Sequence, residues 1–151
     1  MRKLLFALCG FLFFSCEKGL TDEQQLQADI DDIKKYLADH NLTAESTASG
    51  LHYIITAPGS GAHPTISNTV TVNYVGKLLK NEKVFDQTNG TPVSFPLSNL
   101  IEGWQEGIPL LKKGGKGTFF IPSALGYGPS GSGSAIPANA PLIFEIELVN
   151  F

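Results

Sequence analysis

The chain has 151 residues, of which 42% are hydrophobic, and it carries 11 basic against 14 acidic side chains, a net charge of −3 at pH 7. This length suffices for one compact domain with a short extension and excludes two full domains, while the acidic balance argues against a protein that neutralises nucleic-acid phosphates. The only two cysteines, Cys9 and Cys16, exclude a fold held together by several disulfides.

The first fifteen residues have the composition of a secretory signal. Two basic residues precede an apolar run over residues 4–14, which is about half as long as a membrane-spanning helix. The run ends at Ser15 and Cys16, and this pair resembles the lipobox of bacterial lipoproteins, whose cysteine carries the lipid. We therefore expect a lipoprotein signal peptide over residues 1–15, lipidation of Cys16, and a location at the bacterial cell envelope with membrane contact through the lipid. An ordinary secretory signal cleaved nearby is the alternative.

Residues 16–50 are expected to form a lipidated N-terminus, an amphipathic helix and a tether. Thr21 followed by Gln24 predicts a capping box at the start of the helix. Apolar residues then recur at the spacing of one helix face: Leu26, Ile30, Ile33 and Leu37. Three acidic residues are expected on the solvated side: Asp29, Asp31 and Asp32. The helix is expected to end near His40, and the small polar residues 43–50 are typical of a linker.

Such a helix must bury its apolar face to be stable. Three interpretations remain open: the face packs on the following domain, it mediates a homodimer, or the segment is a flexible stalk.

From residue 51 onward the pattern is that of a β domain with one short helix. Strands are expected at 51–55, 69–79, 83–86, 93–97, 117–122 and 142–151. Pro96 favours an edge position for its strand, and the strong alternation of the last strand favours a central one. A helix capped by Ser98 is expected over residues 100–107, and a long loop rich in glycine and proline over 123–141. The fold class of the domain at 51–151 is therefore α+β, a curved antiparallel sheet wrapped around one short helix.

Six segments of this domain carry a pattern that is specific in combination. They are VTVNYVGKL (70–78), KVFD (83–86), PVSFPL (92–97), LIEGWQEGIPLLKKGGKG (100–117), IPSALGYG (121–128) and IPANAPLIFEIELVNF (136–151). In order and spacing they resemble the FKBP-type peptidyl-prolyl cis-trans isomerases, and the N-terminal features resemble the bacterial lipoprotein form of that family. The resemblance implies an isomerase that accelerates rotation of X-Pro bonds in exported proteins. It implies proline-containing polypeptides as partners and no cofactor, metal or nucleic acid.

The resemblance also implies an aromatic pocket that binds the proline. Six residues are expected to act on the substrate: Tyr74, Phe85, Asp86, Ile101, Trp104 and Tyr127. Trp104 would form the floor, the Ile101 N–H and the Tyr127 hydroxyl would donate to substrate carbonyls, and Asp86 would pair with the ligand or with Tyr74. Five further residues are expected to line the pocket: Val93, Phe95, Leu100, Ile136 and Phe144. Val93 stands where well-studied members often carry phenylalanine, which thins one wall.

Two other functions remain open at this point. The same fold could serve as a catalytically weak binding module or chaperone that holds proline-containing segments of envelope proteins. Alternatively, the chain could be a structural lipoprotein whose helix mediates dimerisation. Individually, the pocket residues also fit ordinary roles, with Trp104 as a core anchor and Tyr127 as a loop residue.

Overall fold

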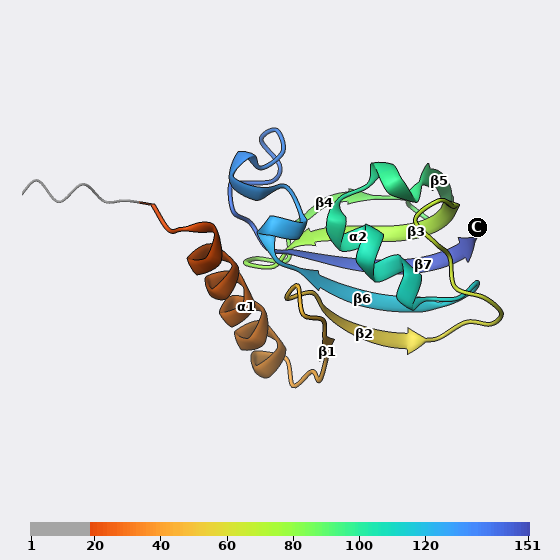
Figure 1. Ribbon diagram of the computed structural model, residues 1–151, viewed down its shortest axis with the longest axis horizontal. Helices are drawn as coiled ribbons and strands as arrows, with labels where there is room; N and C mark the ends of the chain where they lie inside the picture. Colours follow the sequence, from red (N-terminus) through yellow and green to blue (C-terminus); the bar gives the residue numbers. More distant parts are fainter. Residues whose placement is uncertain (1–18) are drawn as a thin grey trace, which may run out of the picture.

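The computed structural model describes residues 19–151, whose backbone is organised around an antiparallel sheet (Figure 1). The strands of this described part are β1 (Glu45–Ser46), β2 (His52–Ala57), β3 (Thr69–Leu78), β4 (Val84–Gln87), β5 (Val93–Pro96), β6 (Lys116–Ile121) and β7 (Leu142–Asn150). Their order is β1-β2-β6-β7-β3-β4, and β5 also pairs with β3. The predicted signal peptide over 1–15 and the predicted lipidation site Cys16 lie outside the described residues.

The expected α+β fold class is confirmed, and the six strands expected from residue 51 onward are present. β7 is central, with β6 on one side and β3 on the other, and its alternate residues from Leu142 to Leu148 are buried. Pro96 is the last residue of β5, whose partner among residues 19–151 is β3. The N–H that proline lacks is therefore not needed for hydrogen bonds to a further strand.

The inner face of the sheet is defined here as the one that packs on the short helix α2 (Glu102–Gly107). Figure 1 shows α2 lying across this face. Alternate residues of β3 and β7 point toward it, and Val70 and Val72 are completely buried there. Leu148 is likewise 0% exposed. The period of two along each strand therefore builds one apolar core between the sheet and α2.

The prediction that Ser98 caps α2 was wrong. Ser98 lies inside a separate 3-10 turn, η1 (Leu97–Asn99), and the residue at the helix start is Ile101, which makes no side-chain cap. Leu100 between them is extended, with φ −94° and ψ 169°. This extended residue separates the Ser98 hydroxyl from the first N–H groups of the helix, which a capping side chain must reach.

Two glycines allow α2 to lie close to β6. A Cβ on Gly103 would be 2.5 Å from Cγ2 of Ile121, and one on Gly107 would be 2.8 Å from Cδ1 of Phe119. Both neighbours are buried in the core, so neither can move aside freely. Glycine is unfavourable inside a helix, and the close approach explains why it occurs at both positions.

We expect Gly103→Ala to lower the free energy of unfolding by about 1–3 kcal/mol, because overpacking outweighs the better helix propensity of alanine. Chemical denaturation measures this difference. Gly19→Ala is the control, since a Cβ there meets no atom within 4 Å. Equal stability of the two variants would contradict the close packing of α2.

The N-terminal helix α1 (Asp22–Asp39) has the expected capping box. The Gln24 amide donates to Thr21 Oγ1 at 3.2 Å, and the Thr21 amide donates to Gln24 Oε1 at 3.0 Å. The helix ends at Asp39 with His40 as its C-cap, also as expected. Its apolar face packs on the outer face of the sheet, where a second core cluster forms: Ile33, Leu37, Leu79, Phe120 and Ile143. These contacts agree with the interpretation in which the helix packs on the following domain. They occupy the apolar face that a homodimer would have used.

One acidic residue of α1 is not where the sequence predicted it. Asp31 and Asp32 are exposed, but Asp29 is only 1% exposed and lies on the packed face with Ile33 and Leu37. The prediction that Asp29 lies on the solvated side was wrong, because a partner 94 residues away in the chain satisfies its carboxylate.

The segment over 43–50, expected to be a tether, contacts the domain along part of its length. β1 pairs with β2 at the edge of the sheet. Ser49 Oγ donates to the carboxylate of Glu106 on α2 at 2.7 Å, and Gly50 is buried. The segment therefore contacts both the sheet and α2. The domain boundary between residues 50 and 51 stays a prediction.

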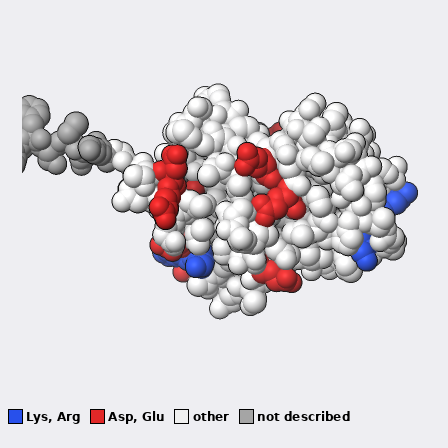
Figure 2. Space-filling model, viewed as in Figure 1, with Lys and Arg blue, Asp and Glu red and all other residues white. Residues whose placement is uncertain are grey.

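The charged side chains are unevenly placed. In the view of Figure 2, acidic side chains cover the start of α1 and lie over α2. α2 itself contributes Glu102 and Glu106. A peptide that approaches α2 from this side therefore meets negative charge. Among residues 19–151, no helix has the length and apolar character needed to cross a membrane.

Candidate functional site

Five aromatic rings meet where α2 crosses the inner face of the sheet. Trp104 lies at their centre, and its ring centroid is 5.1 Å from those of Tyr74 and Phe144 and 6.4 Å from that of Phe95. The three interplanar angles lie between 81° and 89°, which is edge-to-face packing. Phe85 joins the group through Phe144 at 5.5 Å. Four strands and one helix each supply one ring, so the cluster exists only in the folded chain.

The burial of these residues changes from the floor of the cluster to its rim. Trp104, Phe144 and Ile136 are at most 5% exposed. The partly buried members form the walls: Tyr74, Phe85, Phe95, Leu100 and Ile101. Asp86 and Tyr127 are exposed. We call this arrangement the aromatic cup. Val93, with 39% exposure, lies outside the packed cluster, although it shares a strand face with Phe95.

One residue of the cup was missed by the sequence prediction. Gly76 pairs across the sheet with Asp86 of β4 and with Phe144 of β7. A Cβ at this position would be 2.7 Å from Cε1 of Phe144 and 2.8 Å from two ring atoms of Phe85. The absence of a side chain at Gly76 therefore lets these two rings approach each other. A glycine inside an alternating strand is the available signal for such a close approach.

The polar groups of the cup are few. The Tyr74 hydroxyl donates to Asp86 Oδ2 at 2.6 Å, and Asp86 Oδ1 accepts from the Gln87 amide at 2.9 Å. Asp86 therefore pairs with Tyr74, one of the two partners expected for it. Within residues 19–151, the Ile101 amide at the start of α2 donates to no other group. The buried Nε1 of Trp104 also lacks a partner there, so two N–H donors are spare in this apolar surrounding.

Burial and the neighbouring carboxylate together hold both tyrosines in the neutral form. Burial raises the pKa of Tyr74, and the hydrogen bond to Asp86 raises it further. Burial also raises the pKa of Tyr127, with a smaller contribution from the charge of Asp86. Tyr127 is thus close enough to Asp86 to be influenced by it. Both hydroxyls therefore keep their protons at neutral pH, and the Tyr74 proton is donated to Asp86.

We expect the free energy of unfolding to fall as the pH rises above about 10, the ordinary tyrosine pKa. Because the folded-state pKa values of Tyr74 and Tyr127 are raised, their stabilising contribution is complete below that pH and is lost as the pH rises through the folded-state values.

We also expect Asp86→Asn to let Tyr74 ionise at lower pH. Tyrosinate absorbance followed against pH measures this. Glu102→Gln, which removes an exposed charge from α2, is the control, and an identical titration of both variants would contradict the role of Asp86.

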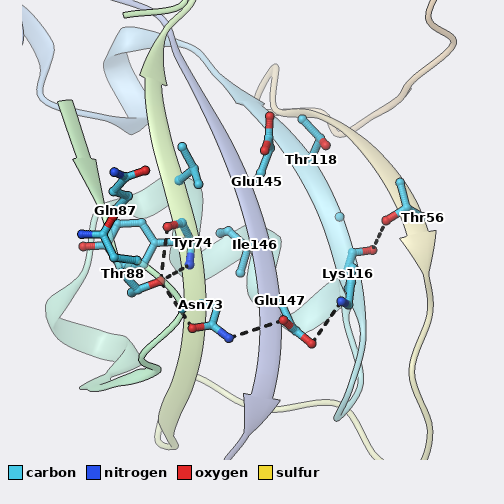
Figure 3. Close-up of a pocket in the computed structure, with 14 residues that line it drawn as sticks. Thr56, Asn73, Tyr74, Gln87, Thr88, Lys116, Thr118, Glu145, Ile146 and Glu147 are labelled. Atoms are coloured by element: carbon cyan, nitrogen blue, oxygen red, sulfur yellow. Dashed lines mark hydrogen bonds and ion pairs between the residues drawn. The ribbon is translucent and has the colours of Figure 1, made fainter. Parts of the chain in front are cut away.

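A separate hollow of about 390 Å³ lies on the outer face of the sheet, and Figure 3 shows its lining. Because side chains alternate along β3, Asn73 points to the opposite face from Tyr74. Its amide donates to Glu147 at 3.4 Å, and Glu147 pairs with Lys116 at 3.2 Å. Asn73, Glu147 and Lys116 therefore pair with one another in this hollow.

No group of three or more histidine, cysteine, aspartate or glutamate side chains in residues 19–151 is placed to hold a metal ion.

Comparisons with known proteins agree on one family. The family model for FKBP-type peptidyl-prolyl cis-trans isomerase matches residues 61–149. A relative from Neisseria meningitidis, named probable FKBP-type peptidyl-prolyl cis-trans isomerase FkpA, is 51% identical over 107 residues, which are 70% of this chain and 39% of that protein. A relative from Aeromonas hydrophila, named FKBP-type peptidyl-prolyl cis-trans isomerase FkpA, is 38% identical over 88% of this chain and 59% of that protein. The chain thus spans between about two fifths and three fifths of the length of these relatives.

Solved structures show the same likeness. The crystal structure of a peptidyl-prolyl cis-trans isomerase from Pseudomonas syringae has a TM-score of 0.71 and 32% identity, covering 88% of this chain and 97% of that one. The crystal structure of FkpA from Escherichia coli also has a TM-score of 0.71, with 33% identity over 88% of this chain and 74% of that one. These coverages extend the likeness beyond the segment matched by the family model.

Proposed function

This chain belongs to the family of FKBP-type peptidyl-prolyl cis-trans isomerases, and from this membership and the aromatic cup we propose that it accelerates cis-trans rotation of X-Pro bonds in polypeptides. The single observation that carries the proposal is the gathering of five aromatic rings around Trp104. The substrates are proline-containing segments of unfolded or folding proteins.

The reaction needs no covalent step. Rotation about an X-Pro bond must cross a barrier of roughly 18–20 kcal/mol, because the amide has partial double-bond character. In the twisted transition state the resonance is lost, and with it part of the charge separation of the planar amide. An apolar surrounding therefore stabilises the twisted form relative to the planar one, and each 1.36 kcal/mol of such preference gives about tenfold in rate.

The cup supplies this surrounding through residues in distinct roles. Trp104 forms the floor under the proline ring, and the walls that exclude water are Tyr74, Phe85, Phe95 and Phe144. Leu100, Ile136 and the side chain of Ile101 complete the apolar lining, while Val93 extends it at the exposed edge.

Hydrogen bonds at the cup provide the remaining preference. The Ile101 amide and the Tyr127 hydroxyl donate to the carbonyl groups that flank the twisting bond. Asp86 holds the Tyr74 hydroxyl and so keeps this ring in place. These roles are supported by the free Ile101 amide and by the Tyr74–Asp86 distance of 2.6 Å.

The test is an isomerisation assay with the purified chain and a short peptide that has an apolar residue before proline. Exchange between the cis and trans signals of the peptide, followed by NMR, gives the rate without a coupled reaction. We expect exchange well above the uncatalysed rate, whose time constant is about 10–100 s. Folded protein that binds the peptide without accelerating exchange would replace this proposal with the binding-module function.

We further propose that the protein is anchored at the cell envelope by lipid on Cys16. The support is the order of sequence features alone: a basic start, an apolar run over 4–14 and Ser15 before the cysteine. Two or three acyl chains anchor a protein stably, whereas one chain binds only marginally.

Cys16→Ala expressed in a bacterial host tests the anchor. We expect the variant to move from the membrane fraction to the soluble fraction and to lose incorporation of labelled fatty acid, while Cys9→Ala, inside the apolar run, keeps both properties. Membrane retention and labelling of Cys16→Ala would contradict the proposal.

A further inference from the structure

A carboxylate is buried in the contact between α1 and the rest of the chain. Asp29 is 1% exposed and follows the spacing of four that brings it onto the same helix face as Ile33 and Leu37. Placing a charged group in an apolar interface is costly unless hydrogen bonds satisfy it. The packing of the helix alone therefore does not explain why a charged residue occupies this position.

Three donors satisfy this carboxylate. Asp29 Oδ2 accepts from the Ser123 amide at 2.7 Å and from Ser123 Oγ at 2.5 Å, and Oδ1 accepts from the Gln25 side chain at 2.7 Å. Ser123 is itself 1% exposed. None of the ion pairs among residues 19–151 involves Asp29, so these hydrogen bonds alone hold it. The two bonds to one residue fix both the backbone and the side chain of Ser123.

Ser123 is the first residue of the segment that leads to the cup. It begins the 3-10 turn η3 (Ser123–Leu125) directly after β6 and Pro122. The turn is short and closed, because the Gly126 amide donates to the Ser123 carbonyl at 3.0 Å. Leu125 packs on the inner core. Tyr127 follows at once, only four residues after Ser123.

We propose that Asp29 is a positioning residue through which α1 fixes Ser123 and thereby the loop that carries Tyr127 over the aromatic cup. The N-terminal helix then sets the geometry of the site without contacting the substrate, and this inference rests on the isomerase activity proposed above. The family match begins at residue 61. Asp29, which fixes Ser123, therefore lies in a part of the chain outside that segment. Figure 1 shows α1 beside the start of this loop, at the end of the sheet away from the C-terminus.

The test compares variants that disrupt the contact between Asp29 and Ser123 with a variant that only weakens the packing of α1 on the sheet. Asp29→Asn keeps the size of the side chain but replaces one acceptor oxygen by a donor, and Ser123→Ala removes the hydroxyl donor. Ile33→Val is the matched control, because it trims the same interface and leaves the Asp29 contacts in place. Each full chain is studied for kcat/KM with the X-Pro peptide, melting temperature, and NMR signals of labelled tyrosine rings.

We expect Asp29→Asn to lower kcat/KM by about tenfold, as misplacement of a positioned group does, and to shift the ring signals of Tyr127. Ser123→Ala changes kcat/KM and the Tyr127 ring signals in the same direction but by less, since the backbone amide of residue 123 still donates to Asp29. The double variant is no worse than Asp29→Asn alone, because both act through one contact. Ile33→Val lowers the melting temperature and changes neither kcat/KM nor the Tyr127 signals.

The inference is overturned if Asp29→Asn or Ser123→Ala lowers the melting temperature while kcat/KM and the Tyr127 signals stay as in the wild type. If Asp29→Asn does not fold, Ser123→Ala decides by the same criteria. If the wild-type chain shows no isomerisation, the proposed function fails, and the Tyr127 signals alone still decide whether α1 positions the loop.

Discussion

Replacing Trp104 by leucine is expected to lower kcat/KM for an X-Pro peptide by at least about tenfold, because the floor of the cup loses its ring. Leucine fills only part of the volume and cannot make the edge-to-face contacts with Tyr74, Phe95 and Phe144, each worth about 0.5–1.5 kcal/mol beyond the area buried. The surrounding rings then lack the partner that orients them, and the proline ring loses a flat apolar surface. The rate is measured by NMR exchange at a temperature where the variant is fully folded.

A control separates this loss of activity from a loss of stability. Ile108→Val removes one methylene group from a completely buried side chain in the same core but outside the aromatic cup. It is expected to cost about 0.5–1.5 kcal/mol of stability and to leave kcat/KM unchanged. Trp104→Leu with wild-type kcat/KM would mean that catalysis occurs elsewhere on the molecule.

The second large effect is expected at Gly76. Gly76→Val should lower the free energy of unfolding by about 3 kcal/mol, since the new side chain overlaps the rings of Phe85 and Phe144. Phe144 is 4% exposed and surrounded by core, so Phe85 is the ring that must move. The displacement opens a wall of the cup, and kcat/KM falls together with stability.

A double variant tests this cause directly. If the overlap with Phe85 is responsible, Phe85→Leu combined with Gly76→Val should cost less than the sum of the two single changes, because the smaller side chain removes the clash. Urea denaturation of the four proteins gives the coupling free energy. Strict additivity would contradict the overlap with Phe85 as the cause, since the φ of Gly76 is one that residues with side chains also adopt.

Much of the site could be predicted because its members come from segments with strong local patterns. Tyr74 follows an alternating strand, Trp104 lies in a short helix, and Phe144 lies in the most regular strand of the chain. The resemblance to a family then assigned these segments to one pocket. Only the structure placed Val93 outside the packed cluster, because the exposure of an edge residue depends on which neighbours cover it.

Two of the features that escaped prediction depend on a partner distant in the chain, Asp29 and the strand at residues 45–46, and one, Ser98, depends on a local turn. Asp29 has the spacing of a buried position and the chemistry of an exposed one, and Ser123 decides between them. Ser98 precedes a helix as a cap would, yet the intervening turn places it elsewhere. Residues 45–46 look like a linker and become a strand only because β2 offers an unpaired edge.

By itself, the sequence determined the elements of this protein: a capped amphipathic helix, strands of period two, and the motifs of its family. These follow from local chemistry, since capping, alternation and turn formation involve neighbours within a few residues. The tertiary structure alone decided what covers the apolar face of α1, why Gly76 and Gly103 lack side chains, and how the N-terminal helix reaches the loop of Tyr127. Such features depend on distances between segments far apart in the chain, which exist only once the sheet has closed around its core.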